Sequence, residues 1–162
     1  MARDKENTLI LELKSGKVVI ALRPDLAPLH VARYKELARK GFYDGVVFHR
    51  VIPGFMAQTG DPTGTGSGGS DMPDLKSEFS AEKHVRGTVS AARTNNPHSA
   101  NSQFFICFDD ATFLDKQYIV WGEVTDGMDC LSKPGPEERH LKAPFRLSCC
   151  SRIVKEEGIK AD

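Results

Sequence analysis

Polar side chains interrupt two apolar β-type runs in the first half of the chain. Residues 48 to 61 are F-H-R-V-I-P-G-F-M-A-Q-T-G-D, so Arg50 and Gln58 stand among large apolar residues. Arginine keeps its charge and presents several N–H donors in one plane. A guanidinium fixed beside apolar surface can stabilise electron density that develops on a bound molecule. The alternative for this stretch alone is structural: Arg50 covers apolar surface with its stem, and Phe55 is a core residue.

A second group of such residues follows farther along the chain. It comprises G-T-V-S-A-A-R from 87 to 93, S-Q-F-F-I from 102 to 106 and F-L-D from 113 to 115.

Alternation along a strand predicts that Phe48, Arg50 and Ile52 share one face. On the following strand it separates Met56 and Gln58 from Phe55, Ala57 and Thr59.

Other chemistries have weaker support. Residues 64 to 69 fit the phosphate-binding spacing G-x-G-x-x-G, but polar and proline residues follow them where an apolar helix would be needed. No G-x-S-x-G sequence for a hydrolase occurs, and the histidines at 30, 49, 84, 98 and 140 lack metal-ligand spacing. The four cysteines show no C-x-x-C spacing, so we expect reduced thiols that pack. We expect neither a cofactor nor a metal.

Composition narrows the class of protein. The 162 residues predict a single domain over 1–162, with flexible ends at 1–7 and 155–162. The 22 basic side chains balance the 22 acidic ones, which argues against nucleic acid or anionic lipid as a partner. No apolar run approaches the roughly 20 residues of a membrane span. We therefore expect a cytoplasmic monomer that does not bind membranes.

The elements that must position these residues are mostly short strands. Apolar alternation predicts a hairpin over 8–22, and helical spacing predicts an amphipathic helix after Pro28 that ends near Gly41. Short β-type runs follow, at 46–52, 55–59, 87–91, 104–108, 119–124 and 145–154, and a short helix is expected near 128–132. This pattern favours a closed antiparallel barrel or a sandwich. Trp121 is expected to pack within the fold.

The motifs in their order along the chain point to a known family. F-H-R-V-I-P-G-F-M-A-Q-x-G-D, a Gly-rich loop, S-Q-F-F-I and F-L-D together resemble the cyclophilin family of peptidyl-prolyl isomerases, and its bacterial cytosolic members most. The resemblance runs from about Thr8 to Gly127. It implies a mainly β fold, a closed eight-stranded antiparallel β-barrel capped by two α-helices, with a substrate groove on its outer surface. It also implies peptidyl-prolyl cis/trans isomerase activity that assists protein folding, with proline-containing peptides and unfolded or folding proteins as partners.

The resemblance further implies the residues of the groove. Arg50 matches the catalytic arginine, and the catalytic set is Arg50, Phe55, Gln58 and Phe105. The remaining substrate-binding positions are His49, Met56, Ala92, Arg93, Gln103, Phe113, Leu114 and Tyr118. His49 either supports the groove through a hydrogen bond or is a satisfied structural histidine.

Three positions depart from the animal pattern of the family. Phe113 replaces a tryptophan, Tyr118 a histidine and Arg93 an asparagine. The family's contact with cyclosporin uses the indole N–H, a donor that phenylalanine lacks. We therefore expect weak cyclosporin binding with catalysis retained.

Two other functions fit parts of the sequence. A binding module of the same fold would hold proline peptides without turning them over, although the retained Arg50, Phe55, Gln58 and Phe105 argue against it. An unrelated β-barrel ligand carrier would have an interior cavity where an isomerase has an outer groove.

Overall fold

Short alternating runs form the strands of the computed structural model, which describes residues 7–13, 16–52, 54–63, 68–128 and 146–149. The chain begins with a hairpin, β1 (Thr8–Leu13) and β2 (Gly16–Leu22), and continues into one α-helix, α1 (Pro28–Arg39). The later strands are β3 (Arg50–Ile52), β4 (Met56–Thr59), β5 (Thr88–Ala91), β6 (Phe104–Cys107), β7 (Ile119–Asp126) and β8 (Arg146–Cys149). A 3₁₀ turn, η2 (Thr112–Leu114), precedes β7.

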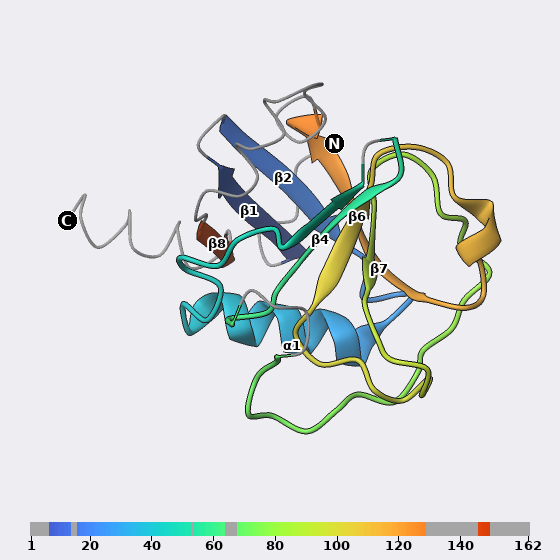
Figure 1. Ribbon diagram of the computed structural model, residues 1–162, viewed down its shortest axis with the longest axis horizontal. Helices are drawn as coiled ribbons and strands as arrows, with labels where there is room; N and C mark the ends of the chain where they lie inside the picture. The colour runs from blue at the N-terminus through green and yellow to red at the C-terminus, as the bar shows by residue number, and fades with distance from the viewer. Residues whose placement is uncertain (1–6, 14–15, 53, 64–67, 129–145, 150–162) are drawn as a thin grey trace.

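All eight strands join one curled antiparallel sheet in the order β3-β4-β6-β5-β7-β2-β1-β8 (Figure 1). The fold is therefore mainly β, as predicted. Within the described ranges the two edge strands, β3 and β8, have no pairing with each other. α1 is the one α-helix described over its whole length, and Met128, where the second expected helix begins, is helical as well. Residues 129–132 of the second expected helix lie outside the described residues.

The predicted hairpin and first helix are confirmed. Leu9 pairs with Ile20 and Leu11 with Val18, so the apolar positions of β1 and β2 share the buried face. Pro28 stands in the first turn of α1, where its missing N–H leaves no hydrogen bond unmade. Gly41 follows the helix with φ +76°, a conformation that ends it at little steric cost.

The concave side of the sheet and α1 enclose the main core. Tyr34 of α1 stacks on Trp121 with ring centroids 4.0 Å apart, and Phe104 meets Trp121 edge-on at 5.4 Å. All three rings are fully buried. Trp121 is thus a packing residue, as predicted, and large side chains fill the place where a ligand carrier would need a cavity.

β3 and β4 begin later than predicted, which moves one residue before each strand to the other face. Regular pairing begins only at Arg50, and Phe48 is fully buried in the main core. The prediction that Phe48 shares a face with Arg50 and Ile52 is therefore wrong, because alternation holds only where the backbone is extended and paired. The same reason applies to Phe55, which precedes β4 and packs beside Met56 on the outside. Of the run at 145–154, residues 146–149 are described and form β8.

Candidate active site

Strand register gathers the polar residues singled out from the sequence. Arg50 of β3 lies opposite Gln58 of β4, and Gln58 lies opposite Phe105 of β6. Residues directly opposite in antiparallel strands point to the same face of the sheet. Arg50, Gln58 and Phe105 therefore form a row across three strands, on the face turned away from the main core.

The next row on this face is apolar. Ile52, Met56 and Cys107 are cross-strand partners, each two residues away from the first row on its own strand. With neighbours from the loops they make a second hydrophobic cluster, separate from the main core and named the outer cluster here. Its buried members are Met56, Phe105, Cys107 and Ala111, and its partly buried ones are Ile52, Phe55, Ala92, Leu114 and Tyr118.

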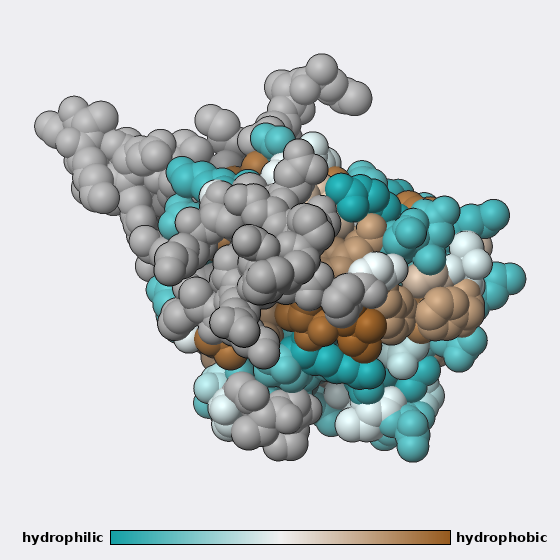
Figure 2. Space-filling view, turned by 45° about the horizontal axis from the view of Figure 1, so that its top comes forward, coloured by the Kyte–Doolittle hydropathy of each residue, from teal (hydrophilic) through white to brown (hydrophobic). Residues whose placement is uncertain are grey.

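The outer cluster keeps part of its apolar surface open. Phe113 is 66% exposed and lies 5.5 Å from Phe55, measured between ring centroids. Tyr118 meets Phe105 edge-on, also at 5.5 Å. Figure 2 shows apolar surface between polar borders on one face of the molecule. Such a surface with an aromatic rim suits a small apolar ring.

Arg50 stands beside this surface with its donors available. It is exposed, and its guanidinium makes no hydrogen bond or ion pair with the residues that the structure describes. The donors can therefore bind a group on a docked molecule without breaking a bond inside the protein.

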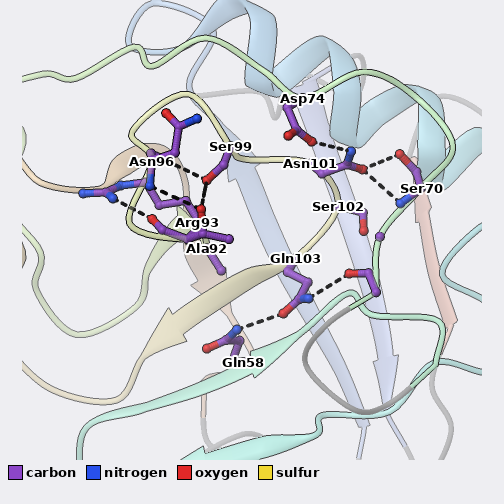
Figure 3. A pocket seen from close by; sticks show the side chains of 13 residues that line it. Gln58, Ser70, Asp74, Ala92, Arg93, Asn96, Ser99, Asn101, Ser102 and Gln103 are labelled. Carbon is purple, nitrogen blue, oxygen red and sulfur yellow. Dashed lines mark hydrogen bonds between the residues drawn. The ribbon is translucent and has the colours of Figure 1, made fainter.

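A polar cleft adjoins the row at Gln58. The cleft has a volume of about 710 Å³, and Gln58, Arg93, Asn101 and Gln103 are among its lining residues (Figure 3). Gln58 Nε2 donates to Gln103 Oε1 at 2.9 Å, and Gln103 Nε2 donates to the Gly68 carbonyl at 2.8 Å. These bonds fix both amides, so Gln58 keeps its carbonyl oxygen for another donor.

Arg93 closes the other end of the cleft and points away from its interior (Figure 3). Its Nε and Nη2 donate to the Gln117 carbonyl at 3.0 and 2.7 Å, and its guanidinium carbon lies 4.9 Å from the centre of the Tyr118 ring. Arg93 thereby ties the cleft to the side of the outer cluster that Tyr118 occupies. Ala92, the preceding residue, belongs to both.

His49 does not act as a second cation at neutral pH. Burial lowers the pKa of His49, with a smaller opposing effect from Asp61 and a further lowering by Arg50. Its Nδ1 is buried without a hydrogen-bond partner in the described part of the chain. The ring therefore gives the groove no hydrogen bond through that atom.

Some residues of the outer cluster were missed from the sequence. Ile52, Cys107 and Ala111 were not named as site residues, although Cys107 lies two positions after Phe105 and so shares its face. Burial raises the pKa of Cys107 to about 12, so it is a neutral thiol that packs. Across the described ranges no three His, Cys, Asp or Glu side chains are placed to hold a metal ion, and no helix is long and apolar enough to cross a bilayer.

Comparison with known proteins adds a family to this geometry. Residues 8–144 match the model of the family described as cyclophilin type peptidyl-prolyl cis-trans isomerase/CLD. A probable peptidyl-prolyl cis-trans isomerase of Brucella suis biovar 1 is 59% identical over 143 residues, which cover 82% of this chain and 73% of the relative. The peptidyl-prolyl cis-trans isomerase-like 1 of Gibberella zeae is 33% identical, with 92% and 96% covered.

Solved structures agree. The cyclophilin AquaCyp293 from Hirschia baltica superposes with a TM-score of 0.80 at 29% identity, covering 93% of this chain and 76% of that one. A cyclophilin type peptidyl-prolyl cis-trans isomerase of Cryptosporidium parvum, solved in the presence of the dipeptide Ala-Pro, gives 0.78 at 26% identity, with 88% and 98% covered.

Proposed function

The chain belongs to the cyclophilin-type peptidyl-prolyl cis-trans isomerases, and from this membership we propose that it rotates X-Pro bonds at the outer cluster beside Arg50. One observation carries the proposal. The row Arg50, Gln58, Phe105 places a cation that pairs with no described residue, and an amide, next to a partly open apolar surface.

The reaction is limited by rate, because the two isomers of an X-Pro bond have similar free energies. The barrier to rotation is roughly 18 to 20 kcal/mol, since the nitrogen lone pair is delocalised into the carbonyl in the planar amide. In the twisted transition state that lone pair returns to the prolyl nitrogen. A fixed cationic donor can bond it there more strongly than in the ground state, which lowers the barrier.

Each group of the site has a part in this scheme. Arg50 donates to the prolyl nitrogen, and Gln58 bonds the substrate backbone. The proline ring rests on Phe55, Met56, Phe105 and Leu114 with Phe113 at the edge, while Ala92, Arg93, Gln103 and Tyr118 line the rest of the groove. Because the ring and the flanking chain are both held, rotation proceeds against a fixed frame.

The wider setting follows from the same membership. We propose that the curled sheet closes into the family's barrel with a second helix, and that the chain is one isomerase domain. Its clients are proline-containing segments of folding proteins, and it works as a monomer in the cytoplasm.

Exchange of an X-Pro bond tests the proposal. Two-dimensional NMR exchange on a proline tetrapeptide, with catalytic amounts of protein, measures the rate. We expect Arg50→Ala to lower this rate by about 100-fold or more, the size seen when a transition-state donor is removed. Arg39→Ala, an exposed arginine at the end of α1, is the matched control and should leave the rate unchanged.

A titration of the same peptide, which measures its Kd, separates an isomerase from a binding module. If Arg50 acts mainly in the transition state, Arg50→Ala should change the Kd for the peptide far less than the exchange rate. Peptide binding by wild-type protein without any exchange would identify a binding module and would refute the proposal.

A further inference from the structure

Three side chains outside the proposed groove form a buried chain of hydrogen bonds. His84 Nδ1 lies 3.0 Å from Asp115 Oδ1, and His84 Nε2 lies 3.1 Å from Ser90 Oγ. His84 and Ser90 are fully buried, and the Asp115 side chain is 20% exposed. The series Ser, His, Asp resembles a hydrolase triad in composition only. Ser90 Oγ donates to the Ile119 carbonyl at 2.8 Å and is closed off from solvent, so it cannot attack a substrate.

The chain of bonds holds one side of the outer cluster. Residues 111–118, named the rim segment here, carry Phe113, Leu114 and Tyr118. They run alongside the segment that contains His84 (Figure 1). The Ala111 N–H donates to the His84 carbonyl at 2.8 Å, and the His84 N–H donates to Asp115 Oδ1 at 2.7 Å. Backbone and ring of one residue therefore bind the rim segment at both ends of η2.

Proton placement gives the ring a defined tautomer. The backbone N–H of His84, which donates to Asp115, is the largest cause that holds the pKa of Asp115 below its usual range, and burial opposes it. Oδ1 therefore belongs to a carboxylate. A carboxylate only accepts, so Nδ1 must carry the proton. Nε2 of the neutral ring then presents a lone pair to the Ser90 hydroxyl at 3.1 Å, and the single hydroxyl proton of Ser90 can serve either Nε2 or the Ile119 carbonyl.

The ring also supports the floor of the cluster. His84 stacks on Phe105 with centroids 6.2 Å apart and planes 17° from parallel. Ser90, its partner through Nε2, is the cross-strand neighbour of Phe105 on β5. One buried imidazole thus contacts the floor at Phe105 and, through Asp115, the rim beside Leu114.

We propose that His84 is a positioning residue, which holds the rim segment over Phe105 at the spacing that a proline ring needs. The inference rests on the proposed function of the outer cluster. Loss of the tie from Nδ1 to Asp115 lets the rim move, which weakens peptide binding and leaves Arg50 of β3 in place. The effect therefore falls on Kd and spares turnover within the complex.

Two substitutions at position 84 separate this role from simple packing. His84→Phe keeps an aromatic ring of similar size but has no donor, and we expect the Kd for the proline tetrapeptide to rise about tenfold, as for a lost hydrogen bond to a charged group. His84→Asn keeps an N–H near the position of Nδ1 and should restore most of the affinity. Exchange within the bound complex should change less than about twofold in both variants.

A double-mutant cycle tests whether His84 acts through Asp115. Asp115→Ala should raise the Kd by a similar factor. The double variant His84→Phe/Asp115→Ala should have about the same Kd as either single variant, because both substitutions remove the same hydrogen bond. His30→Gln is the matched control, since His30 is fully buried and paired with Glu78 at 2.5 Å at the start of α1. It should lower stability and leave Kd unchanged.

Amide hydrogen exchange tests the hydrogen bond between His84 and Asp115 without any substrate. Amides of residues 112–118 should exchange faster in His84→Phe, while those of β1 and β2 keep their wild-type protection relative to the global unfolding rate. Unchanged rim exchange, additive losses in the cycle, or an equal rise in Kd for His30→Gln would overturn the inference. Failure of the wild-type protein to exchange X-Pro bonds would instead refute the proposed function, and the rim amides would still decide the role of His84.

Discussion

Arg50 differs from other arginines of the described chain in what its guanidinium touches. Arg23 pairs with Asp25, Arg33 donates to the Pro73 carbonyl, and Arg93 donates to the Gln117 carbonyl. Those three side chains hold the protein together, whereas no described residue satisfies the guanidinium of Arg50. A cation left free beside apolar surface is available to a ligand, which is why the chemistry is assigned to this residue.

Phe113 sets an expectation for cyclosporin. The drug contact of the family uses an indole N–H, and Phe113 has no donor although it stands exposed at the edge of the outer cluster. We expect weak inhibition of the wild-type protein and about tenfold stronger inhibition of Phe113→Trp, the gain expected from about one added hydrogen bond. The measurement is the drug concentration that halves X-Pro exchange.

A second tryptophan variant controls for added aromatic surface. Leu29→Trp places an indole on another exposed apolar residue, on α1 and outside the outer cluster, and should not change inhibition. Tight inhibition of the wild-type protein would show that position 113 does not limit the drug.

At the scale of elements, local signals identified the hairpin and α1 but not the extent of β3. The alternating leucines predict β1, and Pro28 and Gly41 predict the two ends of α1. These signals depend only on residues nearby in the sequence, so both predictions agree with the structure. Residues 46–49 have strand-like composition, yet they do not pair, and Phe48 turns into the main core. Pairing depends on a partner strand, which composition does not specify.

Gly60 shows how closely two elements approach behind the site. It follows β4 with φ +99°, and a Cβ there would collide with the backbone carbonyl of Ser102 just before β6. We expect Gly60→Ala to lower the free energy of unfolding by about 2 kcal/mol or more, from backbone strain together with overpacking. Urea unfolding followed by tryptophan fluorescence measures the change.

Gly54 provides a matched control for that substitution. Its φ is +74°, but nothing lies within 4 Å of an added Cβ. Gly54→Ala should therefore cost only the roughly 1 kcal/mol of a left-handed conformation. Equal losses for the two variants would mean that the contact with Ser102 contributes nothing.

At the scale of the whole molecule, the site is a product of strand order. Arg50, Gln58, Phe105 and Ser90 come from four strands, and β6 lies between β4 and β5 in the sheet although it follows both in sequence. The motifs and the family resemblance named the first three residues. His84 and Asp115 were not named as site residues, because their link spans 31 positions and leaves no periodic pattern.

Acid should destabilise the whole fold through three histidines that are buried or partly buried. Burial is the largest cause that lowers the pKa of His30, His49 and His84 below 6.5. As the pH falls below about 6.5, the unfolded chain takes up protons that the folded protein does not, so the unfolded state is favoured. The lowered pKa of Asp115 acts in the same direction at lower pH, because its contribution is present above the unfolded pKa and is lost as the carboxylate is protonated.

Urea unfolding at pH 7.5, 6.5 and 5.5 measures this dependence. We expect the free energy of unfolding to fall mainly between pH 6.5 and 5.5, and to fall less steeply in His30→Gln, since that variant removes one of the histidines that take up a proton on unfolding. A stability that stays flat between pH 7.5 and 5.5 would mean that the three rings take up protons in the folded protein as readily as in the unfolded chain. A stability that rises as the pH falls would mean that the rings bind protons more tightly in the folded protein, and Nε2 of His84 would then donate to Ser90.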